Sequence, residues 1–240
     1  MGSTRDVFES VPISPKTGPA ESVPPTSAPP LSAAPLTPRG ARTRAKLIAA
    51  AQALFEHDGY LETSVADIAK RSGVAHGTFY TYFDSKEDVF AEVADALVVD
   101  FQSALAAEPQ LPPGHSVSER IEQTNRSYLS VYARRARMMA VLEQVATFNP
   151  RLAAIRRTSR RMWLQRNTAA VQRWQDANLV DPAIDPAYAA SVLGSMVDRS
   201  AYVWNVLGEP HDFDVAVEQL TRLYCNALGL KCHLDKQNRD

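Results

Sequence analysis

From Arg39 onward the apolar residues recur at helical spacing, and long alternating β-branched runs are absent. The first stripe places its members at i, i+1, i+4, i+7 and i+8: Leu47, Ile48, Ala51, Leu54 and Phe55. It stops at His57-Asp58-Gly59, where glycine can adopt the left-handed conformation that closes a helix. The pattern predicts a first amphipathic helix that ends near Gly59.

Two short helices and one long helix follow. Ser64, with Asp67 three residues later, is typical of an N-cap, and Ser72-Gly73-Val74 ends the second helix after about two turns. A third helix is expected from Ala75 to about Phe83. Ser85, followed by acidic residues, begins a fourth helix. The apolar stripe of this long helix comprises Val89, Phe90, Val93, Leu97 and Phe101.

The stretch from Glu108-Pro109 to Gly114-His115 is the clearest internal break. Beyond it, helices are expected near 117–134, 136–148, 150–178, 185–207 and 212–229. Their breakers are Asn149-Pro150, the pair Asp181-Pro182 and Asp185-Pro186, and Gly208-Glu209-Pro210. The predicted fold is therefore all-α, with a three-helix N-terminal head joined by one helix to a larger helical body.

Proline marks the other predicted boundary. Residues 1–38 hold nine of the sixteen prolines, set among small and polar residues, and have too few large apolar residues to fold on themselves. We predict a disordered tail there; a Pro-rich recognition arm is the alternative. The head then covers 39–86, the body 87–230, and a flexible C-terminal tail 231–240.

Charge changes this picture only locally. The formal net charge is −1, but Arg39, Arg42 and Arg44 stand together without an acid between Pro38 and Arg44, and Lys46 follows. A short cationic arm can neutralise a few phosphates even when the rest of a chain is nearly neutral.

Other chemistry is not indicated. Cys225 and Cys232 offer neither a disulfide framework nor the spacing of metal ligands, and the five histidines do not show that spacing either. No serine lies in the Gly-rich strand-to-helix turn that presents a nucleophile in hydrolases. No apolar run is long enough to span a bilayer, and the N-terminus lacks an export signal. We therefore expect a cytoplasmic protein that is not an enzyme and has no metal, cofactor or membrane partner.

Two helices joined by a short turn with glycine are typical of a helix-turn-helix, whose second helix can lie in the major groove of DNA. In the third helix Phe79 and Phe83 share a face with Ala75 and are expected to pack on the first helix. The opposite face and flanks carry His76, Gly77, Thr78, Tyr80, Thr81 and Tyr82. Hydroxyl and N–H groups can reach phosphate oxygens, and rings can contact thymine methyl groups, so this face suits nucleic acid.

The stretch from Thr63 to Lys86, TSVADIAKRSGVAHGTFYTYFDSK, resembles the DNA-binding signature of TetR/AcrR-type transcriptional regulators. With the first helix, the resemblance covers about one-fifth of the chain. It implies a transcriptional repressor that binds a palindromic operator as a homodimer and is released by a small, largely apolar effector. A DNA-binding activator or an architectural protein of the same fold is the alternative.

The resemblance also implies roles for single residues. His76, Gly77 and Thr78 match positions that approach base edges, and Thr81 also points into the groove. Arg42 and the other arginines of the arm either touch phosphates or enter an adjacent minor groove. Contacts to the phosphate backbone are expected from Thr43, Ser64, Tyr80, Tyr82 and Lys86. Structural roles compete for some of them: Tyr82 could pack under the third helix, Ser64 could serve fully as a cap, and Lys86 could be an ordinary solvated lysine. Ala75 departs from the family, which often has a capping hydroxyl there.

In the body, residues 185–207 are apolar on nearly every side, which predicts burial on two faces. The resemblance implies that this helix and the last one pair with their copies in a dimer. The expected interface residues are Ala189, Leu193, Val197, Leu220, Leu223 and Tyr224.

Bulky, adaptable side chains collect between the connecting helix and the last two helices, where the resemblance implies an effector cavity. Its expected lining is Tyr128, Tyr132, Met138, Met139, Leu142, Met162, Trp163 and Arg166. Ordinary core packing is the alternative for each of them. Arg156, Arg157, Arg160 and Arg161 form a basic patch, which is interpreted as a solvated or ion-paired face or as a site for an anionic group of the ligand.

Overall fold

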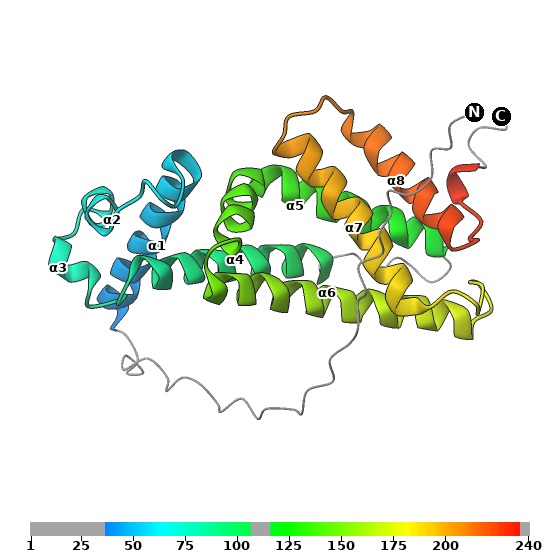
Figure 1. Ribbon diagram of the computed structural model, residues 1–240, viewed down its shortest axis with the longest axis horizontal. Coiled ribbons are helices and arrows are strands. Elements are labelled where there is room, and N and C mark those ends of the chain that lie inside the picture. The colour runs from blue at the N-terminus through cyan, green and yellow to red at the C-terminus, as the bar shows by residue number, and fades with distance from the viewer. Residues whose placement is uncertain (1–36, 107–115, 236–240) are drawn as a thin grey trace, which may run out of the picture. The chain divides into compact units, whose positions relative to one another are not determined.

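The computed structural model describes residues 37–106 and 116–235, in which every regular element is helical (Figure 1). The head contains α1 (Pro38–Asp58), α2 (Val65–Ser72) and α3 (His76–Phe79), and α4 (Lys86–Ala106) leads out of it. The body continues with α5 (Val117–Ala146), α6 (Pro150–Asp176), α7 (Pro186–Asn205), α8 (Phe213–Ala227) and a short 3₁₀ turn, His233–Asp235. The all-α prediction is confirmed. The predicted Pro-rich tail up to residue 36 and the break at 108–115 lie outside the described residues.

Side-chain caps set the helix starts where the sequence predicts them. The Ser64 hydroxyl accepts from the Asp67 amide at 3.2 Å, and the Asp67 carboxylate accepts from the Ser64 amide at 3.1 Å. Asn149 and Asp185 cap α6 and α7 in front of their prolines. Gly59 has a positive φ of 85° but an extended ψ of 168°, so it is not in the predicted left-handed helical conformation, which Gly73 adopts instead.

Two element boundaries differ from the prediction. The helices expected near 117–134 and 136–148 are one helix, α5, because Ala133 to Arg137 are all good helix formers without glycine or proline. The third helix is shorter than predicted: α3 ends at Phe79, and a turn held by Tyr82 N to Phe79 O at 2.9 Å continues the chain to Phe83. Ala75 supplies no side-chain cap, as expected.

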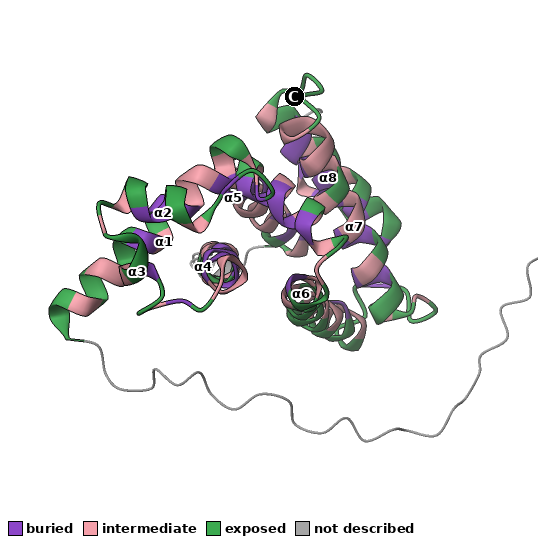
Figure 2. Ribbon diagram, turned by 60° about the vertical axis from the view of Figure 1, so that its left-hand side comes forward, coloured by how far each residue is buried: buried purple, intermediate pink, exposed green. Residues whose placement is uncertain are grey.

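Helix α4 connects the cores of the head and the body. At its start Val89 and Phe90 are fully buried with Phe55 and Phe79, and farther along it Leu97 belongs to the same buried cluster. Figure 2 shows buried positions on head and body helices alike, including α1, α4, α5 and α7. In the body this cluster continues into α5, α6 and α7. Burying one such side chain contributes about 1.5–3 kcal/mol, so a single apolar stripe on α4 stabilises both parts.

The C-terminal segment is packed farther than the sequence predicts. Cys232 and Leu234 are buried in a second apolar cluster with residues of α5 and α8. The imidazole of His233 lies 3.0 Å from the Ser118 hydroxyl through Nδ1 and 2.8 Å from the Glu122 carboxylate through Nε2. The tail predicted to be flexible from residue 231 is therefore docked up to this turn.

Among the described helices, none has the length and apolar character needed to cross a membrane.

The missing cap of α3 gives a stability prediction. Replacing Ala75 with Ser should raise the free energy of unfolding by about 0.5–1 kcal/mol, because a hydroxyl can accept from an amide in the first turn. Urea denaturation followed by circular dichroism measures this change. The control, Ala45→Ser at an exposed position inside α1, should lower stability slightly. Equal effects of both substitutions would contradict the capping argument.

Candidate DNA interface and effector cavity

Helix α3 and the turn that follows it expose four of the predicted DNA-binding residues together. His76, Gly77 and Thr81 are exposed, and Tyr80 keeps 51% of its surface in contact with solvent. The Tyr80 ring is supported by edge-to-face contacts with His76 and with buried Phe79, whose ring centroids lie 5.5 and 5.4 Å away. The segment therefore holds an aromatic hydroxyl and an imidazole toward solvent.

Other predicted contacts already have partners within the chain. The Thr43 hydroxyl donates to the Arg39 carbonyl oxygen at 3.1 Å, and Ser64 is engaged in its capping box. Tyr82 is half-buried against the apolar core, as its structural alternative requires, and Thr78 is also half-buried. The hydroxyl groups of Thr43 and Ser64 keep a free lone pair, but their protons are already used in hydrogen bonds. These two groups are therefore weaker donors to phosphate than an unbonded hydroxyl.

Lys86 is engaged most strongly. Its ammonium donates to the carbonyl oxygens of Tyr60 at 2.8 Å and Thr63 at 2.9 Å, and it lies 4.4 Å from the centroid of the Tyr60 ring. The Tyr60 hydroxyl donates to Glu87 at 2.9 Å. Burial, aided by Glu87, raises the pKa of Tyr60 and keeps it a neutral donor. Lys86 thus holds the turn between α1 and α2 on the start of α4, and this role competes with the predicted phosphate contact.

In the cationic arm, one arginine has partners within the chain and the other cations are exposed. Arg44 forms an ion pair with Glu92 of α4 at 2.6 Å, and its guanidinium lies 5.1 Å from the centroid of the Phe83 ring. Arg39, Arg42 and Lys46 are exposed on α1. These three remain the cations of the arm that are open to a nucleic-acid backbone.

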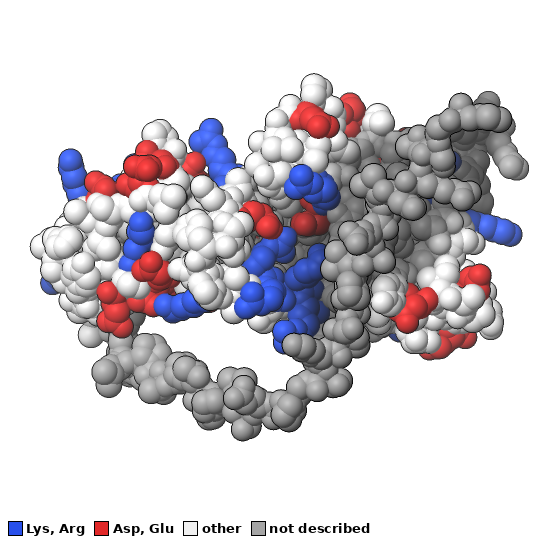
Figure 3. Space-filling model, viewed as in Figure 1, with Lys and Arg blue, Asp and Glu red and all other residues white. Residues whose placement is uncertain are grey.

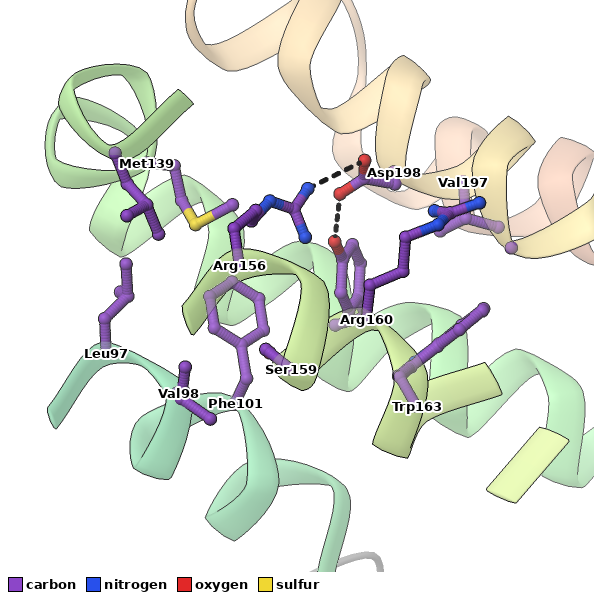
Figure 4. Close-up of a pocket in the computed structure, with 13 residues that line it drawn as sticks. Leu97, Val98, Phe101, Met139, Arg156, Ser159, Arg160, Trp163, Val197 and Asp198 are labelled. Carbon is purple, nitrogen blue, oxygen red and sulfur yellow. Dashed lines mark hydrogen bonds and ion pairs between the residues drawn. The ribbon is translucent and has the colours of Figure 1, made fainter. Parts of the chain in front are cut away.

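A cavity of about 80 Å³ lies among α4, α5, α6 and α7 (Figure 4). Four of the predicted residues line it: Tyr128, Met139, Leu142 and Trp163. We call it the inner cavity. Arg166 lines a neighbouring cavity of about 440 Å³, the outer cavity, which also has Trp163 in its wall.

The other predicted lining residues lie elsewhere. Tyr132 lines a separate hollow with Glu143 and Tyr202. Met138 is buried in the core, and Met162 is 42% exposed on α6. Each methionine neighbours a lining residue in the sequence, and the 100° turn per helical residue directs it elsewhere.

A polar network that the sequence analysis missed closes one side of the inner cavity. The Tyr128 hydroxyl donates to Asp198 at 2.5 Å, and Arg156 binds the same carboxylate at 3.4 Å (Figure 4). Arg156 also binds Glu143 at 2.6 Å. Burial, reinforced by Asp198, raises the pKa of Tyr128 well above its ordinary value. Asp198 is the lone acid of apolar α7, and a half-buried carboxylate needs such partners, so the signal was present in the sequence.

Helix α4 links the cavity to the head. Leu97, Val98 and Phe101 of α4 line the cavity, whereas its first residue, Lys86, holds the turn of the head. Lys86 lies about 17–22 Å along the helix from these three residues, at 1.5 Å per residue. Asp100 pairs with Arg135 of α5 at 2.5 Å, and Asp88 pairs with Arg151 of α6.

The predicted dimer residues lie mainly inside the protomer. Ala189, Leu193, Val197, Leu220 and Tyr224 are buried, and only Leu223 of the predicted set is exposed. The apolar side chains that α7 and α8 leave exposed are Tyr188, Val192, Val215 and Leu223. Both helices are apolar on more than one face, and the most apolar face packs inward. The surface available to a second chain is therefore the neighbouring face of the same helices.

Comparison with known proteins agrees with the geometry of the head. Residues 47–93, from α1 to α4, match the family described as bacterial regulatory proteins, tetR family. The head of the chain is therefore a DNA-binding domain of the TetR family.

The match to individual TetR-family proteins is strongest in the head. The HTH-type transcriptional regulator EthR of Mycolicibacterium smegmatis is 38% identical over 88 residues, which are 32% of this chain and 41% of that protein. AcrR of Shigella flexneri is 23% identical over 186 residues, covering 73% of this chain and 83% of its own. A putative TetR-family regulator from Syntrophomonas wolfei has the same fold, with a TM-score of 0.65 at 20% identity over 79% of this chain and 96% of its own.

The engagement of Lys86 gives a second prediction. Lys86→Met should lower the free energy of unfolding by about 1–3 kcal/mol, because carbonyl oxygens of the turn lose a charged donor. Lys46→Met, at an exposed position on α1, should change it by less than about 0.5 kcal/mol. Urea denaturation compares the two. If Lys86→Met is as stable as Lys46→Met and only DNA affinity falls, Lys86 is a phosphate ligand and not a structural clamp.

Proposed function

We propose that this protein is a ligand-responsive transcriptional repressor of the TetR family, which binds a palindromic operator as a homodimer and releases it when a small, largely apolar effector occupies the body. The observation that carries the proposal is the position of α4. One helix supplies the apolar support of the DNA-binding head and three residues of the cavity wall. Occupancy of the cavity and orientation of the head are thereby connected through one rigid element.

The proposed DNA contacts follow from what α3 and α1 expose. His76, Gly77 and Thr81, with Thr78, are proposed to approach base edges, whereas Tyr80 and Arg42 contact phosphates. Gly77 has only open space around the position of a Cβ atom, so the backbone can come close to DNA there. Thr43, Ser64, Tyr82 and Lys86 remain predicted contacts, each of which has another role within the chain.

The proposed dimer uses the exposed face of α7 and α8, where Tyr188, Val192, Val215 and Leu223 lie. Large apolar side chains at helical spacing on two neighbouring elements are typical of an interface. Binding to successive major grooves requires that the two-fold axis of this dimer place the two copies of α3 about 34 Å apart.

Release is proposed to be a shift between two conformations. A ligand must bind more tightly to a conformer whose heads are wrongly spaced for DNA than to the operator-bound conformer. The inner cavity is mostly apolar, and its polar lining consists of the pair formed by Arg156 and Asp198 together with Tyr128, Ser159 and Arg160. This lining supports an effector with a substantial apolar body.

The DNA-binding proposal is tested by selecting the fragments that the purified protein retains from random DNA. We expect a palindrome to be enriched. Thr78→Ala should relax preference at one position of each half-site, and Tyr80→Phe should weaken binding to selected and random DNA by the same factor.

Thr158→Ala, on an exposed position of α6 in the body, is the matched control and should leave both properties unchanged. Fluorescence anisotropy with the selected and a scrambled duplex measures them. Absence of any enriched palindrome, or an equal loss of affinity with Thr158→Ala, would contradict the proposal.

A further inference from the structure

Two cavities lie on opposite sides of Trp163. The inner cavity of about 80 Å³ and the outer cavity of about 440 Å³ have Tyr128, Trp163 and Val197 in common among their lining residues. These three side chains come from α5, α6 and α7. They form the partition between the two spaces, and the indole is the largest part of it.

The indole rests directly on the backbone of α7. A Cβ atom placed on Gly194 would lie 1.8 Å from Cη2 and 2.0 Å from Cζ3 of Trp163, closer than any real contact. Glycine inside a helix costs about 1 kcal/mol relative to alanine. The indole fills the space that a side chain would need, so the position of Trp163 depends on Gly194. Figure 4 shows Trp163 reaching from α6 toward α7.

The two cavities differ in charge. The inner cavity contains a carboxylate, Asp198, which pairs with Arg156, whereas Arg160 of the same lining donates to the Ser195 hydroxyl at 2.9 Å. The outer cavity is lined by three arginines, Arg120 from α5 and Arg166 and Arg173 from α6, and its lining among the described residues contains no aspartate or glutamate.

The spacing along α6 explains why the cations converge. Arg166 and Arg173 are seven residues apart, two helical turns, and so lie on the same face. Arg157 and Arg161 are exposed on the same helix but line neither cavity. Figure 3 shows Lys and Arg side chains gathered over the part of α6 that runs beside α4 in Figure 1. A cleft lined by charges of one sign raises the local concentration of counter-ions, so this lining favours an anionic ligand.

We propose that the two cavities are halves of one site for an amphipathic organic anion. Its carboxylate lies among the arginines of the outer cavity, and its apolar body passes Trp163 into the inner cavity. Guanidinium groups bind carboxylates through paired, charge-assisted hydrogen bonds, and the inner wall of Leu97, Phe101 and Leu142 accepts an alkyl or aryl group. The inference deepens the proposed function by naming the chemical class of the effector.

The test compares ligands that share a body and differ in charge. Octanoate, octan-1-ol and octylammonium are titrated into the full chain by calorimetry, without DNA, together with the matched naphthyl series: 2-naphthylacetate, 2-(2-naphthyl)ethanol and 2-(2-naphthyl)ethylammonium. At least one anion should bind about tenfold or more tightly than its alcohol and its ammonium analogue. An alcohol or ammonium that binds as tightly as its anion, or no binding of either anion at millimolar concentration, would overturn the proposal.

Charge-matched variants locate the anion. Arg120→Gln with Arg173→Gln should weaken anion binding about tenfold or more and leave alcohol binding unchanged. Arg157→Gln with Arg161→Gln removes the same charge from outside the cavities and should change anion binding less than about twofold. Equal losses in the two double variants would show a general charge effect and contradict the site.

Tryptophan fluorescence tests whether the ligand passes beside Trp163. The chain has three tryptophans, so Trp174→Phe with Trp204→Phe leaves Trp163 as the only one. Octanoate does not absorb at the wavelengths that excite tryptophan. Because Trp174 lines the outer cavity, calorimetry is repeated on the same double variant, and octanoate should shift the Trp163 emission with the affinity measured there. Unchanged emission at saturation would contradict passage of the ligand beside Trp163.

These results separate the inference from the proposed function. A chain that binds the anions but no operator contradicts the repressor proposal and leaves the anion site standing. A chain that binds its operator but none of the anions contradicts the anion site alone.

Discussion

The burial of α4 along one continuous stripe is the constraint on which the rest of the structure depends. Val89 and Phe90 complete the core of the head, and Leu97 enters the core of the body eight residues after Val89. The head is too small to bury its apolar faces without this helix, because a small domain leaves much of its apolar surface exposed. The body in turn needs α4 as one wall of its cavity. A rotation or shift of α4 therefore repacks both ends, since close-packed cores do not deform freely.

The ion pairs of α4 fix its position relative to α5 and α6 but contribute little to the stability of the fold. Asp88 is bonded to Arg151 and Asp100 to Arg135, so α6 and α5 each hold one end of the helix. Partly exposed pairs of this kind contribute about 0–1 kcal/mol each, much less than the buried apolar stripe. Their geometry nevertheless selects one orientation of α4 relative to α5 and α6.

Local sequence signals predicted most of the fold and the exposed face of α3. Capping residues such as Ser64 and Asp185 act within three residues, and helical spacing distinguishes Phe79 from Tyr80 on one short segment. The residues that have a different partner or face from the one predicted depend on contacts with residues distant in sequence. Nothing near Lys86 in sequence reveals that its ammonium reaches the carbonyl oxygens of Tyr60 and Thr63. The inward face of α7 could not be chosen either, because two of its faces are apolar and only packing against α5 and α6 distinguishes them.

Filling the inner cavity is proposed to move the head through α4. This movement can be tested without any ligand by Val98→Phe, because half-buried Val98 lines this cavity from α4 and a phenyl ring would occupy it. The matched control is Val99→Phe, whose neighbouring side chain is 54% exposed. The measurement is the affinity of each variant for the selected operator by fluorescence anisotropy, with intact folding confirmed by circular dichroism. The account predicts that Val98→Phe binds the operator about tenfold or more weakly than Val99→Phe, which should match the unmodified chain. Equal operator affinity of a folded Val98→Phe variant would contradict it.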